Sequence, residues 1–297
     1  MKQLVVTADD FGLSIPVNEA IEQAYRDGIL TATSLLVNAP CADDAVQRAR
    51  RNPGLRVGLH VAVTRCRAAL PESDAITDAA GNLPDNLVGA GVRYFFLPRA
   101  RRQLAAEIRA QFEAFRATGL ALDHVNGHNH MHLHPTVFSL ILGIGADYGL
   151  AAVRLPREPL RPFLAAGREK LPARALQRLF LGPWVWLLSQ RLRRAGVRSN
   201  DWLFGLFDTG AMDSTRVLAL LPHLPPGLSE MMFHPARSGS GSRPLADAAA
   251  CRAELATLLD ERVRARLVAL GITTRAFDGT SAGNGAAPFA HVTTSAD

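Results

Sequence analysis

Four short segments of the chain carry side chains that bind metals or move protons. Asp9 and Asp10 follow an apolar N-terminal segment, and His60 closes another apolar segment. A histidine-rich tract covers residues 124–134, and His234 follows a third apolar segment. Two adjacent carboxylates repel each other unless a cation neutralises one of them, and the other can then accept a proton. The four segments therefore predict metal-assisted hydrolysis, provided that the fold brings them together.

The histidine tract is the strongest of these signals. Five of the nine histidines fall between residues 124 and 134. From His128 to His134 they alternate with other residues, so an extended backbone would place all four on one face. Neutral imidazole is a common ligand of zinc-like metals. Five histidines cannot all bind one ion, so some must contact the substrate or orient the ligands. The alternative is an exposed polar tract or a hydrogen-bonding network.

Taken one at a time, the other residues have simpler explanations. The Asp9–Asp10 pair alone is also typical of a helix cap or a solvated loop. A single histidine in an apolar strand, such as His60, is usually a core residue with satisfied hydrogen bonds. His223 and His291 are interpreted as structural or solvated residues.

Apolar segments alternate with amphipathic segments along the chain, which is typical of repeated βα units. The candidate residues all follow expected strands, and a parallel βα barrel collects the carboxyl ends of its strands at one face. The pattern predicts an α/β fold in one domain, in which one barrel joins the four segments. Expected strands cover residues 3–7, 31–37, 55–63, 120–125, 229–233 and 272–276. Expected helices start at Ser14 and cover residues 43–50, 101–117, 136–148, 245–258 and 260–269.

Composition narrows the class of protein. The chain has 297 residues, of which 48% are hydrophobic and 20% charged, as in an ordinary globular domain. Its three cysteines are widely spaced and predict no disulfide framework, which suits a reducing compartment. No signal peptide and no membrane-spanning segment is recognisable. We therefore expect a cytoplasmic protein.

Four motifs in this order resemble one known family. TADDFG near the N-terminus, GLHV around His60, HVNGHNHMHLHP and a late FHPA are similar to the motifs of the YdjC-like carbohydrate deacetylases, relatives of chitooligosaccharide deacetylase. The resemblance covers residues 1–278. It implies a distorted TIM-like (β/α) barrel and a hydrolase that removes the N-acetyl group from an acetylated aminosugar. The tail at 279–297 is rich in Ser, Thr, Gly and Ala and is expected to be disordered.

The resemblance also implies roles for individual residues. Asp10, His60 and His128 would bind one divalent metal, Asp9 would be the general base, and His234 would be the general acid. Mixed nitrogen and oxygen ligation favours zinc, and Mg, Co or Ni also fit.

Three further residues are candidates for substrate contact or for orienting the ligands. His130 and His132 belong to the histidine tract, and Arg154 follows a short apolar segment. For Arg154, a surface position is the simpler interpretation. One departure from the family pattern is Asn126-Gly127, where the family often has Asp-Ser before the first histidine of its cluster.

An apolar, basic insertion lies near residues 157–200. Residues 154–198 contain ten Arg and one Lys against two Glu, a net charge of +9. Trp184 and Trp186 with flanking arginines in the segment 173–195 are typical of a helix at a membrane surface. The alternative is a helix packed on the barrel with a solvated basic face. No base-stacking motif or recognition module appears, so no nucleic-acid partner is expected.

The insertion is similar to that of the hopanoid-biosynthesis branch of the family. This likeness implies a lipid-linked substrate such as acetylglucosaminyl hopanoid, and a peripheral position on the inner face of the cytoplasmic membrane. The alternatives are a deacetylase of soluble chitooligosaccharides, a metal-dependent sugar isomerase or phosphodiesterase, and a metal-binding or membrane-surface protein without catalysis.

Overall fold

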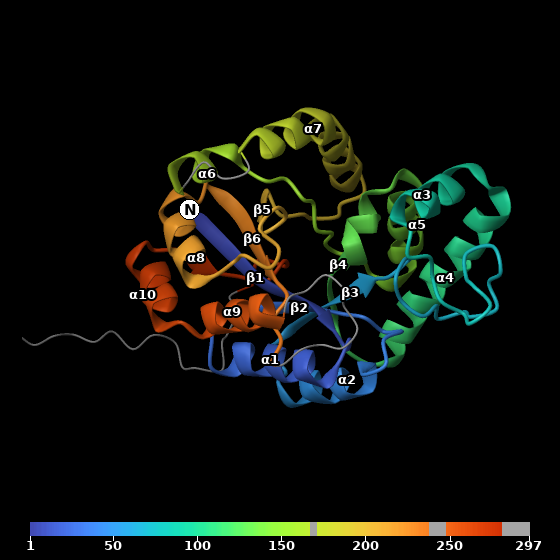
Figure 1. Ribbon diagram of the computed structural model, residues 1–297, viewed down its shortest axis with the longest axis horizontal. Coiled ribbons are helices and arrows are strands. Elements are labelled where there is room, and N and C mark those ends of the chain that lie inside the picture. Colours follow the sequence, from blue (N-terminus) through green and yellow to red (C-terminus); the bar gives the residue numbers. More distant parts are fainter. Residues whose placement is uncertain (167–170, 238–247, 281–297) are drawn as a thin grey trace, which may run out of the picture.

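A curled parallel sheet forms the centre of the molecule (Figure 1). The computed structural model describes residues 1–166, 171–237 and 248–280. The seven strands follow the order β4-β3-β2-β1-β6-β5, and β7 pairs with β1. Their bounds are β1 Lys2–Phe11, β2 Ala32–Leu35, β3 Arg56–Val61, β4 Leu122–Gly127, β5 Trp202–Phe204, β6 Gly227–Phe233 and β7 Thr273–Thr274.

The central strand, β1, is buried along almost its whole length, from Leu4 to Phe11. It pairs in parallel with β2 on one side and with β6 on the other. A parallel strand covered on both faces needs a continuous apolar sequence, which the run LVV after Gln3 supplies. The carboxyl ends of β1, β3, β4 and β6 therefore lie at the same end of the sheet.

Isolated β-bridges extend the sheet beyond β4. Val125 of β4 bridges to Val153, and Ala152 bridges to Arg198, just before β5. The backbone N–H of Arg154 donates to the carbonyl of Val125 at 3.0 Å. These contacts bring residues 151–155 alongside β4 and curl the sheet toward closure. The α/β fold in one domain with a distorted TIM-like barrel is thereby confirmed.

Helices surround the sheet (Figure 1). The α-helices are α1 Ile15–Arg26, α2 Ala42–Arg51, α3 Leu87–Phe96, α4 Pro98–Ala117, α5 Pro135–Gly145, α6 Leu160–Ala166, α7 Leu171–Arg194, α8 Ser214–Leu220, α9 Ala248–Leu259 and α10 Glu261–Ala269. Three 3₁₀ turns are η1 His128–Leu133, η2 Ala146–Tyr148 and η3 Leu221–His223. Within the described ranges, no helix has both the length and the apolar character that crossing a bilayer requires.

The expected elements are found with shifted ends. Strand β1 extends to Phe11, so Asp9 and Asp10 belong to the strand and do not follow it. The expected insertion contains α6 and the helix α7, which has Pro183 in its interior. The first residues of the expected helix 245–258 and the expected disordered tail beyond residue 280 lie outside the described residues. The three cysteines form no disulfide, as expected.

Candidate active site

A local irregularity at the end of β1 turns two consecutive carboxylates toward one site. In a regular strand, neighbouring side chains point to opposite faces. The pairing of β1 with β2 shifts register between Ala8 and Phe11, and Asp10 has a φ of +66°. Aspartate is one of the few residues that tolerate this left-handed region, and such bulges are common beside active sites. Asp9 and Asp10 therefore both face the interior of the curled sheet, and each is 2% exposed.

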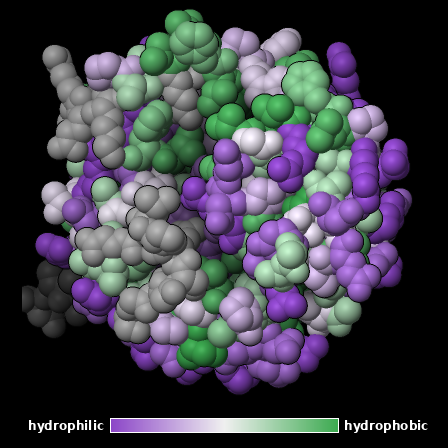
Figure 2. All heavy atoms as spheres, turned by 45° about the vertical axis from the view of Figure 1, so that its right-hand side comes forward, coloured by the Kyte–Doolittle hydropathy of each residue, from purple (hydrophilic) through white to green (hydrophobic). Residues whose placement is uncertain are grey.

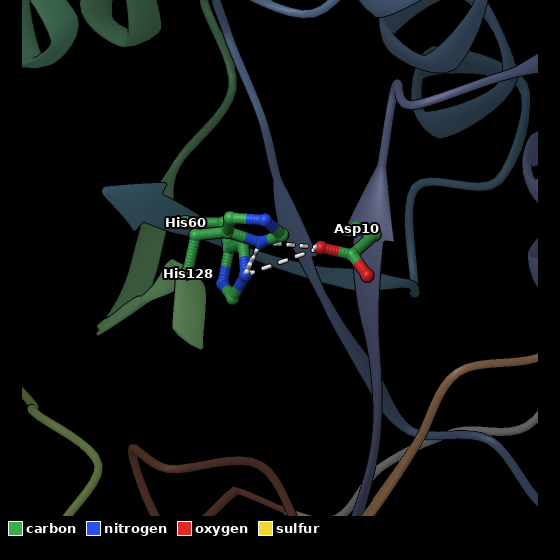
Figure 3. A group of neighbouring side chains, drawn as sticks. All are labelled: Asp10, His60 and His128. Carbon is green, nitrogen blue, oxygen red and sulfur yellow. Dashed lines mark hydrogen bonds and ion pairs between the residues drawn. The ribbon is translucent and has the colours of Figure 1, made fainter. Parts of the chain in front are cut away.

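Asp10 of β1, His60 of β3 and His128, which begins η1 directly after β4, converge on one point (Figure 3). The Asp10 Oδ1 atom lies 3.3 Å from His60 Nε2 and 3.0 Å from His128 Nδ1. The two imidazole nitrogens are 3.4 Å apart. Ligand atoms on a tetrahedral ion with bonds of about 2.0–2.1 Å lie roughly 3.3 Å from one another. The spacing and chemistry of this buried group therefore fit one divalent ion.

The tautomer of His60 also supports a divalent ion between these three side chains. His60 and Asn126 are cross-strand partners in β3 and β4, and His60 Nδ1 lies 2.6 Å from Asn126 Oδ1. The side-chain nitrogen of Asn126, Nδ2, donates to Asp9, because an ionised carboxylate can only accept a hydrogen bond. The side-chain oxygen of Asn126 therefore faces the imidazole of His60. Nδ1–H of His60 is thus the donor, and in the neutral ring Nε2 offers its lone pair toward Asp10. A cation between that lone pair and the carboxylate relieves their repulsion.

Asp9 is held by a separate network. Arg154 NH1 and NH2 donate to the two Asp9 oxygens at 2.5 and 2.9 Å. Ser34 Oγ and Asn126 Nδ2 donate to Asp9 Oδ1 at 2.9 and 3.1 Å. Burial by itself would raise the pKa of Asp9, but Arg154, through its charge and its hydrogen bonds, and the nearby His60 and His234 together hold the pKa well below its ordinary value of 3.8. Asp9 is therefore ionised at neutral pH.

Arg154 links Asp9 to a third carboxylate, Glu230 of β6. The Arg154 NH2 atom lies 2.6 Å from Glu230 Oε1, and both side chains are 0% exposed. Two carboxylates raise the pKa of Arg154 above its ordinary value, although burial opposes them. The site therefore buries three carboxyl groups, those of Asp9, Asp10 and Glu230, beside one guanidinium. Buried charges need compensation, which a divalent cation would supply.

The histidine tract does not have the predicted extended form. His128–Leu133 is a 3₁₀ segment, and Asn129 and His130 have φ values of 53° and 55°. The expectation that four alternating histidines share one face is therefore wrong, because the backbone turns after β4. His128 ends beside Asp10, whereas the rings of His130 and His132 pack 5.8 Å apart. Burial, aided by the positive charge of neighbouring groups, lowers the pKa of His130 to about 3 and that of His132 well below its ordinary value.

His234 approaches the site from β6. It lines a small pocket together with Asp9 and Asp10, and Leu13, Val17, Pro235 and Cys251 form the remaining walls. Its backbone N–H donates to Glu254 Oε2 of α9 at 2.5 Å. Glu254 is 1% exposed and also accepts from the backbone of Gly210 at 2.7 Å. The Glu254 carboxylate thus fixes the turn that carries His234.

Asp10, His60 and His128 form one group, Arg154 contacts Asp9, and His234 shares a pocket with Asp9 and Asp10. His130 and His132 follow His128 in η1. The surface interpretation of Arg154 is wrong, because its side chain is completely buried against Asp9. Sequence reasoning missed Ser34, Asn126 as a partner of His60, and Glu230. Their common signal is a polar residue within an expected strand, since a polar group that a strand buries needs hydrogen-bond partners.

Comparisons with known proteins identify the family of this chain. Residues 3–269 match the YdjC-like protein family. A carbohydrate deacetylase of Brevibacillus brevis is 33% identical over 172 residues, which are 57% of this chain and 62% of that protein. A carbohydrate deacetylase of Vibrio cholerae serotype O1 is 34% identical over 174 residues, 58% of this chain and 63% of that protein. The aligned part is thus less than two thirds of each relative.

One solved structure has the same fold. A protein of Enterococcus faecalis V583, whose proposed role is cellobiose-phosphate cleavage, superposes with a TM-score of 0.73. The superposition covers 94% of this chain and 99% of that one, at 21% sequence identity. At this identity the likeness concerns the fold alone.

Proposed function

Because the chain belongs to the YdjC-like protein family, we propose that it is a metal-dependent hydrolase that removes the N-acetyl group from an acetylated aminosugar. The observation that carries the proposal is the buried group Asp10, His60 and His128 with a second carboxylate, Asp9, beside it. The two carbohydrate deacetylases of similar sequence support the proposed substrate class. The family match does not favour the sugar isomerase or phosphodiesterase alternatives.

In this proposal, Asp10, His60 and His128 hold one divalent ion, with zinc as our choice among zinc, Mg, Co and Ni. Such an ion supplies Lewis-acid polarisation of the acetyl carbonyl and acidifies a water molecule. Two histidines and one carboxylate leave coordination positions open, as catalytic zinc sites require. Asn126 keeps His60 in the tautomer whose Nε2 faces the ligand group.

Asp9 and His234 divide the proton transfers. Asp9 accepts the proton that the attacking water loses as the new C–O bond forms. His234 donates a proton to the sugar nitrogen as the C–N bond breaks, so that a free amine and acetate leave. Arg154 keeps Asp9 ionised and fixes the direction of its oxygens. His130 and His132, which the low pKa values keep neutral, are proposed to contact the sugar or to support this arrangement.

The substrate that we propose is lipid-linked, with acetylglucosaminyl hopanoid as the specific candidate. Two observations support this substrate. The insertion resembles that of the hopanoid branch, and its helix α7 exposes Leu179 and Phe180 at 70% each. We further propose that the protein works in the cytoplasm, peripherally on the inner face of the membrane. A soluble chitooligosaccharide is the competing substrate.

The test is hydrolysis of matched substrates by the zinc-loaded protein. Acetylated glycolipids and soluble N-acetylglucosamine oligosaccharides are incubated separately, released acetate is measured, and the sugars are examined by mass spectrometry for loss of one acetyl group. We expect acetate from the glycolipid at the higher kcat/KM. Faster hydrolysis of the soluble oligosaccharide would contradict the lipid-linked substrate, and no acetate from any acetylated aminosugar would contradict the deacetylase.

A further inference from the structure

Exposed large apolar side chains are concentrated on α3, α6 and α7. Among the described residues, sixteen large hydrophobic side chains are exposed, and twelve of them lie on α3 with the adjoining Leu97, on α6 or on α7. On α3 and Leu97 they are Val88, Val92, Phe95, Phe96 and Leu97; on α6 and α7 they are Leu164, Leu176, Leu179, Phe180, Leu181, Trp186 and Leu187. Figure 2 shows hydrophobic side chains gathered along the upper part of the visible face. Clusters of this kind mark interaction surfaces.

Helices α3 and α7 both contact the end of one segment of the site. Trp184 of α7 donates its indole N–H to the carbonyl of Leu133 at 2.9 Å. Phe95 of α3 packs edge-on against His134, with ring centroids 6.2 Å apart. Leu133 ends η1, the segment that begins with the ligand His128. The apolar side chains of α3 and α7 therefore lie beside the segment that carries His128.

Both helices combine this apolar surface with positive charge alone. Residues 87–102 contain four arginines, and residues 171–194 contain five, and neither segment contains Asp or Glu. Seven arginines on or next to these helices are exposed: Arg93, Arg99, Arg101, Arg102, Arg178, Arg193 and Arg194. Apolar side chains interspersed with arginine suit the boundary between acyl chains and anionic headgroups.

We propose that α3, Leu97, α6 and α7 form one docking surface for an anionic lipid bilayer, which presents the site to substrates embedded in that bilayer. The part of this proposal that concerns substrates rests on the proposed deacetylase function. The charge pattern argues for lipid over a second copy of the chain, because α3 and α7 carry arginine and no acidic residue, so a symmetric contact would bring arginines of both copies together. Asp74, which pairs with Arg99 at 2.6 Å, offsets one of these charges. The surface combines α3, which sequence reasoning missed, with the helix of the insertion.

The test measures co-sedimentation of the full-length chain with vesicles of phosphatidylcholine, with and without phosphatidylglycerol. We expect binding only when phosphatidylglycerol is present. The double variant Phe96→Ser/Phe180→Ser should weaken it about tenfold or more, because two aromatic side chains no longer leave water. The matched control is Val268→Ser, which changes an exposed apolar residue on α10 and should bind like the wild type.

A second pair of variants tests the role of charge. Arg102→Gln/Arg193→Gln removes one exposed arginine from each side and should reduce the dependence on phosphatidylglycerol, with about fivefold weaker binding. Arg266→Gln on α10 is the matched control and should change nothing. If Arg266→Gln weakened binding as much as Arg102→Gln/Arg193→Gln, the membrane would attract the whole basic protein without a defined surface, and the proposal would be overturned.

Other outcomes are equally decisive. Absence of wild-type binding, or equal binding by Phe96→Ser/Phe180→Ser and Val268→Ser, would overturn the proposal. So would a concentration-dependent dimer that the double variant abolishes, since a second copy would then cover the surface.

Activity separates this proposal from the proposed function. The double variant should hydrolyse soluble acetylated oligosaccharide at the wild-type rate and a vesicle-embedded acetylated glycolipid more slowly. Normal vesicle binding without acetate release from either substrate would refute the deacetylase and leave the docking surface standing. Normal release from both substrates by the double variant would refute presentation of the substrate by this surface.

Discussion

At the ends of β1, β3 and β4 charged and polar side chains are buried, whereas on α3 and α7 aromatic and aliphatic side chains face solvent. The buried groups compensate one another only in part, since Arg154 serves both Asp9 and Glu230, and Asp10 faces two histidines. The exposed apolar groups have no comparable compensation within the described chain. Buried charges and exposed apolar patches both cost free energy, so a region that retains either is a candidate for function. The type of group that is uncompensated indicates the type of partner that would bind there. For the first region that partner is a divalent cation, and for the second it is lipid.

Among the predicted effects, we expect the largest from removal of a metal-binding side chain in the buried region. His60→Ala deletes one nitrogen of the triad, so we expect bound metal to fall from about one equivalent to near zero. Acetate release should fall by roughly 10⁴-fold or more, because both the polarised carbonyl and the acidified water are lost. Metal analysis of the purified variant measures the first effect directly. His223→Ala, an exposed histidine of η3, is the matched control and should keep both metal and activity. Full metal occupancy in His60→Ala would remove His60 from the site.

The proton-transfer residues should separate metal binding from turnover. We expect Asp9→Asn to retain metal and to lose about 10³-fold in kcat, and His234→Ala to retain metal and lose about 10²-fold. Metal content and acetate release are measured on the same preparations. An active, metal-replete Asp9→Asn protein would rule out the general-base role, and full activity of His234→Ala would reassign the general acid.

Arg154→Lys should change the pH profile more than the metal content. Arg154 lowers the pKa of Asp9, and a lysine cannot reproduce its two parallel hydrogen bonds. The pKa of Asp9 should therefore rise. Because the base must be ionised, the acid limb of kcat/KM should move to higher pH. Near neutrality we expect a loss of about tenfold, because lysine no longer fixes the direction of the Asp9 oxygens through two parallel hydrogen bonds. An unchanged acid limb together with unchanged metal content would show that another group sets it.

The fold class and the chemical residues could be predicted because strand ends and metal-binding residue types are local signals. Asp10, His60 and His128 each follow or close an apolar run, so their convergence required only that the strands be parallel. The conformation of the histidine tract could not be predicted, because the turn at Asn129 and His130 depends on packing against β4. Arg154 was misplaced because a single arginine after a short apolar segment is usually at the surface, and its buried partners, Asp9 and Glu230, come from strands far away in the sequence. Helix α3 was missed because Gly89 and Gly91 interrupt its pattern.

Among the predicted effects of substitutions, the smallest concerns Gly127, at the end of β4, where the histidine tract begins to turn. A Cβ on Gly127 would lie 2.9 Å from both the Cβ and the backbone nitrogen of His132, so η1 would have to shift. We expect Gly127→Ala to lower the free energy of unfolding by about 1–3 kcal/mol and to weaken metal binding. Gly143→Ala is the control, because a Cβ there meets open space in α5, and it should stabilise by about 0.5–1 kcal/mol. Thermal unfolding of both variants measures the difference. Equal stability of the two proteins would mean that the segment after β4 adjusts freely.

The most direct test of the central claim is an anomalous-difference map at the zinc edge from crystals of the zinc-loaded protein. We predict one peak within bonding distance of Asp10 Oδ1, His60 Nε2 and His128 Nδ1, with Asp9 beside it and not bonded to it. An active, zinc-loaded protein whose ion lies on other residues would contradict the account.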